Sequence, residues 1–245
     1  MQPAPLKLSE GNDASASRNA SPSPALTRSA LGVTSVIKVG VLALQGAFVE
    51  HIEMLRRLGV EAPAIRLPAE LQGLDGLIIP GGESTTICRL MASYNLREAL
   101  KGLAEAGLPM LGTCAGMILL AARAVGLAEG PLGVMDIKVR RNAFGRQVDS
   151  FEVDLRIPAL GDAPFHAVFI RAPFIEAVGP GVEVLASLPE GIPVAARQGN
   201  LVVSAFHPEL TTDLRFHRYF LNLVESRRRP GKGERPRAGS RKMGA

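Results

Sequence analysis

The first half of the chain alternates between short apolar runs and segments in which apolar residues recur at helical spacing. The apolar runs are 36–44, 60–65, 74–82 and 108–114. Helical patterns cover 48–59 and 84–106, and a further one begins after Cys114. Nearly continuous apolar strands that alternate with helices are typical of a parallel sheet whose two faces are both covered. The pattern therefore predicts an α/β fold with a mostly parallel central sheet and helices on both faces.

The pattern changes in the second half of the chain. Residues 133–157 alternate between apolar and polar side chains around a turn at Asn142–Gly145, which predicts an antiparallel β excursion. A closing helix is expected at 212–228. Further short strands are expected at 163–173, 181–188, 192–199 and 200–209. Because Trp is absent and aromatic residues make up only 4% of the chain, we expect an aliphatic core.

The two ends differ in composition from the part between them. Residues 1–36 are rich in Ser, Ala, Pro and Asn without an apolar period, so we expect a disordered N-terminal extension. We expect no signal peptide there, since a basic start and an apolar stretch are missing; a transit peptide or a misplaced start codon are the alternatives. Residues 226–245 are expected to form a disordered basic tail, which leaves 37–225 as the folded domain.

The net charge of +5 comes from the tail. Residues 226–245 carry eight Lys or Arg and one Glu, and residues 1–36 add one positive charge, so residues 37–225 carry −3. This balance gives no support for a nucleic-acid-binding face on the folded part, although the tail could contact an acidic partner or RNA. No run of about 18 apolar residues occurs, so we expect no membrane span.

Cysteines and histidines are few and scattered. Cys88 and Cys114 cannot build a disulfide framework, which indicates a reducing compartment, taken here as the cytoplasm. Together with four histidines they lack the ligand spacing of a zinc site, so we expect no bound metal. Cys88 falls in a helical pattern and is expected to be a packed small hydrophobic residue.

The second cysteine has a more specific setting. Cys114 lies in the frame Gly112-x-Cys114-x-Gly116, between a predicted strand and a predicted helix. This frame matches a nucleophile elbow with Cys in place of Ser, where the turn is so sharp that only small residues fit beside the nucleophile. The N-terminus of the following helix would favour the thiolate form. The alternative is a buried cysteine whose small neighbours only permit close packing.

A thiolate nucleophile needs a base and a group that orients the base. The sequence His-Pro-Glu, at the end of a predicted strand, offers both in His207 and Glu209. Residues two apart on a strand point to the same side, so the carboxylate can bond one imidazole nitrogen while the other faces the sulfur. The remaining histidines, His51, His166 and His217, have no such setting and are interpreted as structural.

A third candidate is the sequence PGGES at 80–84, which ends another predicted strand. Its glycines let the backbone approach a ligand, and we expect the N–H groups of Gly82 and Ala115 to stabilise an oxyanion. The alternative is an ordinary turn with Ser84 as a helix cap. Because the carboxyl ends of parallel strands meet at one edge of a sheet, all three candidate segments are expected on the same rim.

Six sequence blocks, in this order, resemble the class I, triad-type glutamine amidotransferases. They are VGVLALQGAFVEHIEMLRRLG, GLIIPGGESTTICRLM, GTCAGMILLA, RRNAFGRQVDSFE, FIRAP and AFHPEL. Within that family the chain is most similar to the glutaminase subunits of pyridoxal 5′-phosphate synthase, from about residue 37 to residue 224. The resemblance implies the flavodoxin-like fold of class I glutamine amidotransferases for residues 37–225.

The resemblance also implies an activity and a partner. Such subunits hydrolyse L-glutamine to L-glutamate and ammonia through a cysteinyl thioester. They pass the ammonia through a protein tunnel to a synthase subunit, which makes pyridoxal 5′-phosphate. In the family the glutaminase is nearly silent until the synthase binds, and twelve copies of each subunit assemble. The glutaminase chemistry needs neither a metal nor a cofactor.

Carried over by position, the resemblance makes Cys114 the nucleophile, His207 the general base and acid, and Glu209 its orienting group. The expected glutamine contacts are Gly82, Glu83, Ser84, Arg141, Ile170 and Arg171. The two arginines could meet the substrate carboxylate or hold the loops that do. Ile170, with an aliphatic side chain, is expected to offer backbone groups.

Three alternatives remain open. An amidotransferase subunit of another biosynthetic complex would share the triad but not the blocks RRNAFGRQ and FIRAP together. A cysteine hydrolase or protease of similar fold commonly has His directly after Cys, where this chain has Ala115. A binding module without catalytic activity would have no need for the intact Cys, His and Glu.

Overall fold

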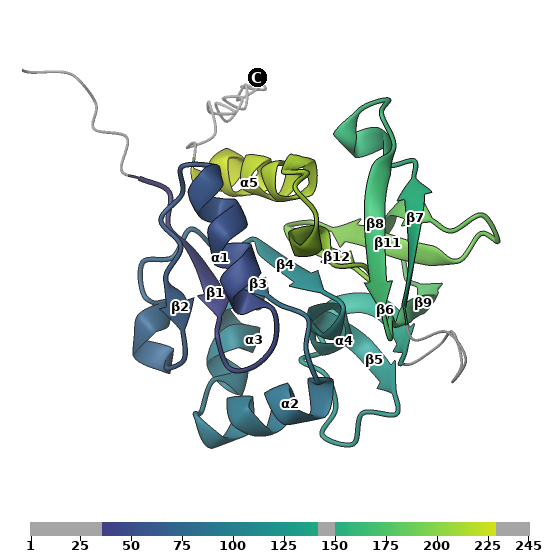
Figure 1. Cartoon of the computed structure of the whole chain (residues 1–245). Helices are drawn as coiled ribbons and strands as arrows, with labels where there is room; N and C mark the ends of the chain where they lie inside the picture. The colour runs from purple at the N-terminus through teal and green to yellow at the C-terminus, as the bar shows by residue number, and fades with distance from the viewer. Residues whose placement is uncertain (1–35, 142–149, 229–245) are drawn as a thin grey trace, which may run out of the picture. The chain divides into compact units, whose positions relative to one another are not determined.

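The computed structural model describes residues 36–141 and 150–228. Within them one sheet is built from β1 (Val39–Leu42), β2 (Ala64–Ile65), β3 (Gly76–Ile79), β4 (Met110–Thr113), β10 (Glu183–Ser187), β11 (Pro193–Gln198) and β12 (Leu201–Ser204). The strand order is β10-β11-β12-β4-β3-β1-β2 (Figure 1). The strands from β12 to β2 run parallel, and β11 and β10 extend one edge antiparallel.

The central strands of this sheet are buried along their whole length. Every residue of β1, β3, β4 and β12 is buried, because the sheet is covered on both faces. This burial explains why these strands appear in the sequence as continuous apolar runs and not as alternating patterns. The predicted α/β fold with a mostly parallel central sheet is confirmed.

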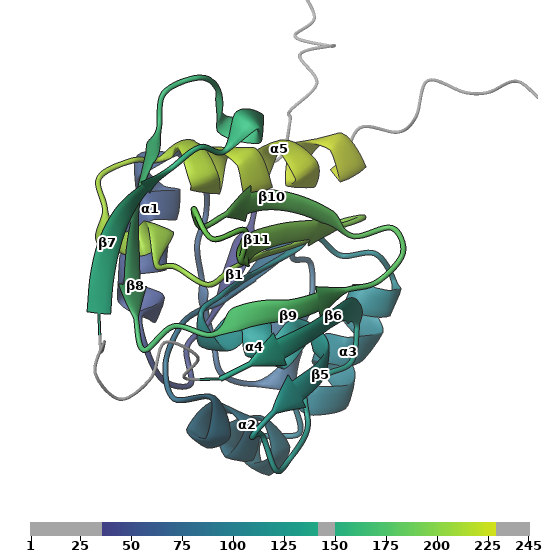
Figure 2. The ribbon, with the colours of Figure 1, turned by 90° about the vertical axis from the view of Figure 1, so that its right-hand side faces the viewer.

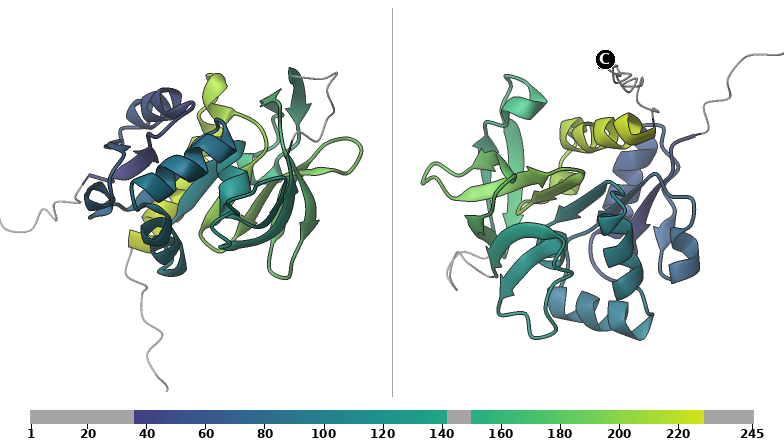
Figure 3. Two further views of the ribbon diagram at one scale, coloured as in Figure 1. Left: turned by 90° about the horizontal axis from the view of Figure 1, so that it is seen from below. Right: turned by 180° about the vertical axis from the view of Figure 1, so that it is seen from behind.

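The α-helices of the described residues are α1 (Phe48–Arg57), α2 (Ser84–Ser93), α3 (Arg97–Glu105), α4 (Ala115–Leu120) and α5 (Arg215–Arg228). Short 3₁₀ helices are η1 (Pro68–Leu71), η2 (Pro158–Leu160) and η3 (Pro208–Leu210). Helices α1 and α5 lie on one face of the sheet, and α3 and α4 lie on the other (Figures 1 and 3). None of these helices is both long and apolar enough to cross a membrane.

Residues with a left-handed backbone conformation mark where two of the helices end. After α1, Gly59 has φ of 76°, and the N–H of Val60 donates back to the carbonyl of Leu55 at 3.1 Å. The single helical pattern at 84–106 is split into α2 and α3 at Asn95, which has φ of 56°. Glycine and asparagine are the residues that tolerate this conformation best, so both helix ends are encoded locally.

Two smaller sheets stand beside the central one (Figure 2). Their strands are β5 (Ala121–Val125), β6 (Met135–Arg140) and β9 (Phe174–Val178) in one, and β7 (Ser150–Leu155) and β8 (Phe165–Ile170) in the other. Strand β6 pairs parallel with β5 and antiparallel with β9, while β7 pairs antiparallel with β8. The predicted excursion is therefore only partly right: β6 and β7 belong to different sheets, and the expected turn at Asn142–Gly145 lies outside the described residues.

The sequence pattern does not predict β5 or β9. The residues after Cys114 are mostly Leu and Ala, which favour a helix and hide the start of a strand. In the structure α4 ends at Leu120 and β5 begins at Ala121, where it pairs with Met135 of β6. Pairing between distant segments thus overrides the local helical preference.

Aromatic residues gather where β8 packs near α5. The rings of Phe165, Phe206 and Phe216 contact one another, with centroid separations of 5.6, 6.0 and 5.2 Å. All three side chains are fully buried. The expectation of an aliphatic core is therefore incomplete, because aromatic side chains form part of the core in this region.

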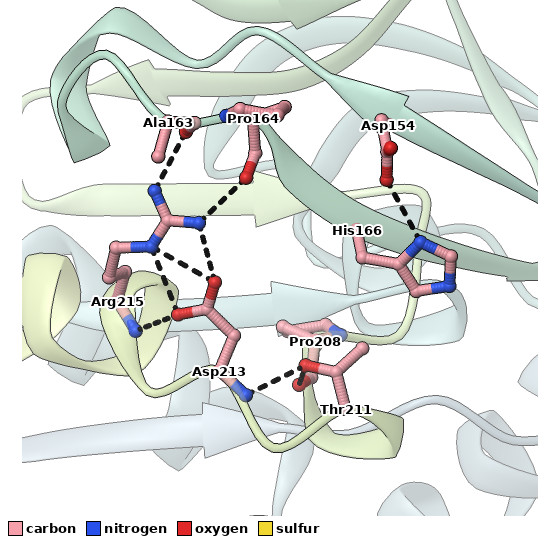
Figure 4. Close-up of polar contacts among 8 residues, drawn as sticks. All are labelled: Asp154, Ala163, Pro164, His166, Pro208, Thr211, Asp213 and Arg215. Carbon is pink, nitrogen blue, oxygen red and sulfur yellow. Dashed lines mark hydrogen bonds and ion pairs between the residues drawn. The ribbon is translucent and has the colours of Figure 1, made fainter.

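Arg215, at the start of α5, binds the edge of this aromatic cluster. Its guanidinium donates to the carbonyls of Ala163 and Pro164, both at 2.8 Å, and bonds the carboxylate of Asp213 (Figure 4). It also lies over the ring of Phe165, 5.8 Å from the centroid. Helix α5 and the segment that leads into β8 are thus joined by charge-assisted hydrogen bonds as well as by apolar packing.

Helix α5 extends into the segment predicted to be the tail. Ser226 Oγ donates to the carbonyl of Asn222 at 2.7 Å, and Arg228 lies 3.3 Å from a carboxylate oxygen of Asp75. These contacts explain why the helix continues past residue 225. Residues 1–35 and the rest of the predicted tail lie outside the described residues, so their disorder stays a prediction.

Helix α4 packs closely against β3 at Gly116. A Cβ atom there would collide with the carbonyl oxygen of Ile79 in β3. At Gly102 in α3, a Cβ atom would meet no atom within 4 Å. These two helical glycines therefore form a natural pair of tests for how closely α4 must approach β3.

We expect Gly116→Ala to lower the free energy of unfolding by roughly 2 kcal/mol or more, because the backbone of β3 must move to admit the methyl group. The control Gly102→Ala is expected to gain up to about 1 kcal/mol, since Ala is the better helix former and the site is open. Urea unfolding followed by circular dichroism measures both. Equal stability of the two variants would contradict the packing argument.

Candidate active site

Three strand ends meet at one edge of the central sheet. Ile79 of β3 lies opposite Gly112 of β4, and the N–H of Cys114 donates to the carbonyl of Ser204 in β12 at 2.7 Å. The segments that follow these strands therefore begin side by side. They contain PGGES, Cys114 and His207, so the predicted common rim is present in the structure.

Cys114 joins β4 directly to α4 in a conformation that side chains rarely adopt. Its φ is 48° and its ψ is −102°. Gly116 lets the new helix lie directly against Ile79, which keeps the turn short. Strained backbone of this kind persists where the surroundings fix it, and it is frequent at reactive residues. The segment thus has the strand, sharp turn and helix expected of a nucleophile elbow.

His207 and Glu209 follow β12 on a tight turn and not on the strand itself. Strand β12 ends at Ser204, and the 3₁₀ helix η3 begins at Pro208. His207 Nδ1 lies 2.7 Å from Glu209 Oε1, and the His207 backbone N–H donates to the carbonyl of Val168 in β8 at 2.8 Å. The predicted contact is present, but its predicted basis in strand alternation is wrong: the turn brings the two side chains together.

Burial and hydrogen bonding together set the charges of this pair. Burial alone would lower the pKa of His207, but its hydrogen bonds with Cys114 and Glu209 outweigh burial and raise the pKa to about 10. Burial alone would raise the pKa of Glu209, but the contacts with His51 and His207 hold it below its usual value. At neutral pH the His207 imidazole is therefore a cation that lies between the Glu209 carboxylate and the Cys114 sulfur.

His51 contacts Glu209 on the side away from His207. The sequence does not predict this buried contact, because His51 was expected to be structural. Nε2 of His51 lies 3.3 Å from Glu209 Oε2 and 3.1 Å from Thr113 Oγ1. Its Nδ1 lies 2.9 Å from Nε2 of His217. One signal in the sequence points to it: His51 lies four residues before Leu55, on the apolar face of the α1 pattern, where a polar ring must find buried partners.

The first part of PGGES is fixed by the residues around it. The N–H of Gly81 donates to Thr113 Oγ1, and its carbonyl accepts from the N–H of Ala47, both at 3.1 Å. A Cβ atom at Gly81 would collide with the His207 ring. Only glycine therefore lets the loop pass this close to the imidazole.

Gln45 braces the next part of the loop. Its Oε1 accepts the N–H of Glu83 at 2.7 Å and lies so close to Gly82 that a Cβ atom there would collide with it. Gln45 is absent from the sequence predictions, although it follows β1 on the same rim. Its position after a parallel strand is the signal that could have identified it.

Glu83, and not Ser84, caps the N-terminus of α2. Its carboxylate accepts the N–H groups of Thr85 and Thr86 at 3.0 and 2.6 Å. Burial raises the pKa of Glu83, but these bonds and the Thr86 hydroxyl outweigh burial and lower it to about 2. The guanidinium of Arg141 lies 3.3 Å from the same carboxylate. Ser84 is buried as the first residue of the helix.

The remaining predicted contacts come from the two smaller sheets. Arg141 follows β6 and donates to the carbonyl of Gly126 at 2.6 Å, so it ties loops together. Ile170 ends β8, and its carbonyl lies 3.9 Å from Cys114 Sγ. Arg171 comes next, exposed and with φ of 43°. Strand β8 therefore reaches the rim at the cysteine.

A cavity of about 470 Å³ opens at this rim. Its lining consists of Gln45, Gly82, Glu83, Ser84, Cys114, Ile118, Arg141, Ile170, Arg171, Pro173 and His207. The predicted nucleophile, the predicted base and all of the predicted glutamine contacts therefore border one space of a size that suits a small molecule. Glu209 and Ala115 are buried and lie outside this lining.

The other singled-out residues do not line this cavity. Cys88 is buried in α2 within the apolar core, where burial raises the pKa of its thiol. His166 is exposed on β8 and bonds Asp154 and Glu152 of β7 at 3.0 and 2.9 Å (Figure 4 shows the contact with Asp154). These bonds raise the pKa of His166 and link the two strands.

Comparison with known families and proteins gives a consistent result. Residues 41–226 match the SNO glutamine amidotransferase family. A protein of Moorella thermoacetica, named pyridoxal 5′-phosphate synthase subunit PdxT, is 60% identical over 188 residues, which cover 77% of this chain and 100% of that protein. A protein of the same name from Herpetosiphon aurantiacus is 62% identical, over 76% of this chain and 99% of its own.

Among solved structures, one described as the crystal structure of a glutamine amidotransferase is similar along the same part of the chain. It is 53% identical, with a TM-score of 0.72, and the match covers 76% of this chain and 98% of that one. The similarity in sequence and in fold therefore extends over nearly the full length of each of these proteins.

The cap at Glu83 predicts a pH-dependent contribution to stability. A carboxyl group whose pKa falls from 4.5 in the unfolded chain to about 2 in the folded one stabilises the fold above the higher value. That stabilisation is lost as the pH falls from the higher value towards the lower. We expect Glu83→Gln to lower the unfolding midpoint at pH 7 and to match the unsubstituted protein near pH 2.

Thermal unfolding measured from pH 7 down to pH 2 tests this expectation. The control is Glu98→Gln, which removes a charge from the first turn of α3, a helix without a side-chain cap. A difference between Glu83→Gln and the unsubstituted protein that stays constant over the whole pH range would show that the charge of Glu83 is not the stabilising feature.

Proposed function

The chain belongs to the SNO glutamine amidotransferase family, and from this premise we propose that it is the glutaminase subunit of a pyridoxal 5′-phosphate synthase. It hydrolyses L-glutamine to L-glutamate and ammonia. The relatives from Moorella and Herpetosiphon support this assignment, because the chain matches nearly the whole length of proteins that carry this subunit's name. Residues 37–225 form the glutaminase domain.

One observation carries the proposal. Cys114 and the imidazolium of His207 border the same cavity, and the side chain of Glu209 holds the imidazole from behind at 2.7 Å. A cysteine, a base and a carboxylate in this order form the unit that activates a thiolate for attack on a carbonyl carbon. We assign them as nucleophile, general acid and base, and orienting group.

The first half of the reaction forms a thioester. The Cys114 thiolate attacks the side-chain amide carbon of glutamine, and negative charge develops on the amide oxygen. The N–H groups of Gly82 and Ala115 stabilise this oxyanion. His207 gives its proton to the departing nitrogen, the carbon–nitrogen bond breaks, and ammonia leaves a γ-glutamyl thioester on Cys114.

The second half releases glutamate. His207, now neutral, takes a proton from a water molecule whose oxygen attacks the thioester carbon. The carbon–sulfur bond breaks, and Cys114 returns to the thiolate while His207 is again the cation. Glu209 keeps the ring oriented and stabilises its positive charge in both halves.

The glutamine contacts divide into two groups by what else they bond. Arg171 is exposed at the cavity, and we assign it to the substrate α-carboxylate. Arg141 bonds Gly126 and Glu83, which suits a role in holding the loops that border glutamine. Ile170 offers its carbonyl. Gly82, Glu83 and Ser84 offer backbone groups from the loop before α2.

The ammonia has a destination in this proposal. It passes through a tunnel to a synthase subunit, and twelve copies of each subunit form the assembled complex. The two cysteines are free thiols, which suits a reducing compartment, and we assign the protein to the cytoplasm. The glutaminase subunit is nearly silent without the synthase subunit.

We expect Cys114→Ala to abolish the release of glutamate and ammonia from L-glutamine, even with the synthase subunit present, because no thioester can form. The matched control is Cys88→Ala, which removes the other thiol, buried in α2 and away from the cavity. It is expected to keep most of the activity. Coupled assays of glutamate and ammonia measure both, and turnover by a folded Cys114→Ala variant would refute the assigned nucleophile.

We also expect the synthase subunit to stimulate the glutaminase strongly. The measurement is glutamate release by the full chain, alone and in an equimolar mixture with the synthase subunit, over a range of glutamine concentrations. Full activity of the isolated chain would argue for an independent hydrolase. If the synthase subunit stimulates glutamate release only when Cys114 is intact, the stimulation acts on the proposed chemistry.

A further inference from the structure

Behind Glu209 lies a fully buried row of polar side chains that the reaction above does not use. His51, Thr113 and His217 all have no exposed surface. We propose that His51 is a positioning residue for the reaction, because its Nε2 lies 3.3 Å from the second carboxylate oxygen of Glu209 and bonds Thr113, which in turn bonds the loop at Gly81. The inference rests on the proposed function, since it assigns a role within that same site.

The contacts fix which nitrogen of His51 carries its proton. Nε2 lies 3.3 Å from Glu209 Oε2, and a carboxylate oxygen at this distance is favourable only if the nitrogen presents an N–H. His51 Nδ1 must then accept a hydrogen bond, and Nε2 of His217 lies 2.9 Å from it in position to donate one. The two imidazoles thus carry one proton each, on Nε2 in both rings.

The surroundings of the two rings agree with this assignment. Burial lowers the pKa of His51 and outweighs the attraction of Glu209. Burial and the neighbouring His51 lower the pKa of His217 to about 3. Both rings are therefore neutral at physiological pH, and each has one donor and one acceptor nitrogen.

The row orients the carboxylate from the side opposite His207. Glu209 Oε1 bonds His207 Nδ1 at 2.7 Å. Among the described residues Oε2 has no hydrogen-bonding partner, and its polar contact is with Nε2 of His51 at 3.3 Å. Without His51, this buried oxygen would lose its one compensating contact, and the carboxylate could turn away from His207. The imidazole would then lose the group that sets its orientation.

A second branch reaches the loop expected to hold the oxyanion. Nε2 of His51 lies 3.1 Å from Thr113 Oγ1, and the same oxygen accepts the N–H of Gly81 at 3.1 Å. Thr113 is the last residue of β4, directly before Cys114. One imidazole thus contacts both the group that orients His207 and the hydroxyl that holds the Gly81 backbone.

Two amide substitutions separate this role from a merely structural one. The nitrogen of a glutamine side chain can occupy the place of Nε2, whereas that of asparagine is one bond shorter and corresponds to Nδ1. With the synthase subunit saturating, we expect His51→Asn to lose roughly tenfold or more in kcat with little change in KM, because an orienting contact is lost away from the substrate. We expect His51→Gln to retain most of the activity.

A second readout does not depend on turnover. Alkylation of the Cys114 thiol by iodoacetamide, measured in a Cys88→Ala background, reports how well His207 maintains the thiolate. We expect slower alkylation in His51→Asn and a rate close to that of the Cys88→Ala protein in His51→Gln. Met54→Leu, a conservative change at another buried residue of α1, is the control for packing and should leave both readouts unchanged.

The outcomes are distinct. Equal kcat and alkylation rates in His51→Asn and His51→Gln, or a loss confined to KM, would overturn the positioning role while leaving the proposed function intact. A His51→Asn protein that does not fold beside a folded His51→Gln protein would also overturn it, since His51 would then serve the fold alone. No glutaminase activity in the unsubstituted complex would instead refute the proposed function, and this inference with it.

Discussion

The register of three neighbouring parallel strands determines where the reactive groups stand. Strands β3, β4 and β12 end together, so the chain leaves the sheet at three adjacent points and delivers a glycine loop, a cysteine and a histidine to one rim. The close approach of α4 to β3 at Gly116 keeps the turn at Cys114 short. If that approach were lost, the strained backbone of Cys114 would relax. The sulfur would then leave its place beside the PGGES loop and His207.

The charges of the buried His207 and Glu209 compensate each other at this rim. A buried carboxylate and a buried imidazole are costly alone, but together at 2.7 Å each stabilises the charged form of the other. Hydrogen bonds with Cys114 and with Glu209 together raise the pKa of His207 to about 10, despite burial. The second oxygen of Glu209 faces His51 from α1, so helix packing and site electrostatics are not separable here.

The sequence predicts the parts of the site that follow from short-range rules. Apolar runs predict β1, β3 and β4, and the Gly-x-Cys-x-Gly frame predicts the turn at Cys114, because both depend on neighbouring residues. Prediction from the sequence fails where the structure depends on contacts between segments far apart in the chain. The pairings of β5, β6 and β9 join separate segments of the chain, and the partners of His51 come from three separate elements. A polar residue on an apolar helix face shows that a partner must exist but does not identify it.

Strand β8 shows how much the site depends on those unpredicted pairings. Its Val168 carbonyl accepts the His207 backbone N–H, and its Ile170 carbonyl lies 3.9 Å from Cys114 Sγ. Both contacts come from a two-stranded sheet that is separate from the central one. The central sheet fixes where Cys114 and His207 leave it, and β8 contacts both residues on the far side of the rim. A displacement of β8 would alter both contacts at once without disturbing the buried parallel strands.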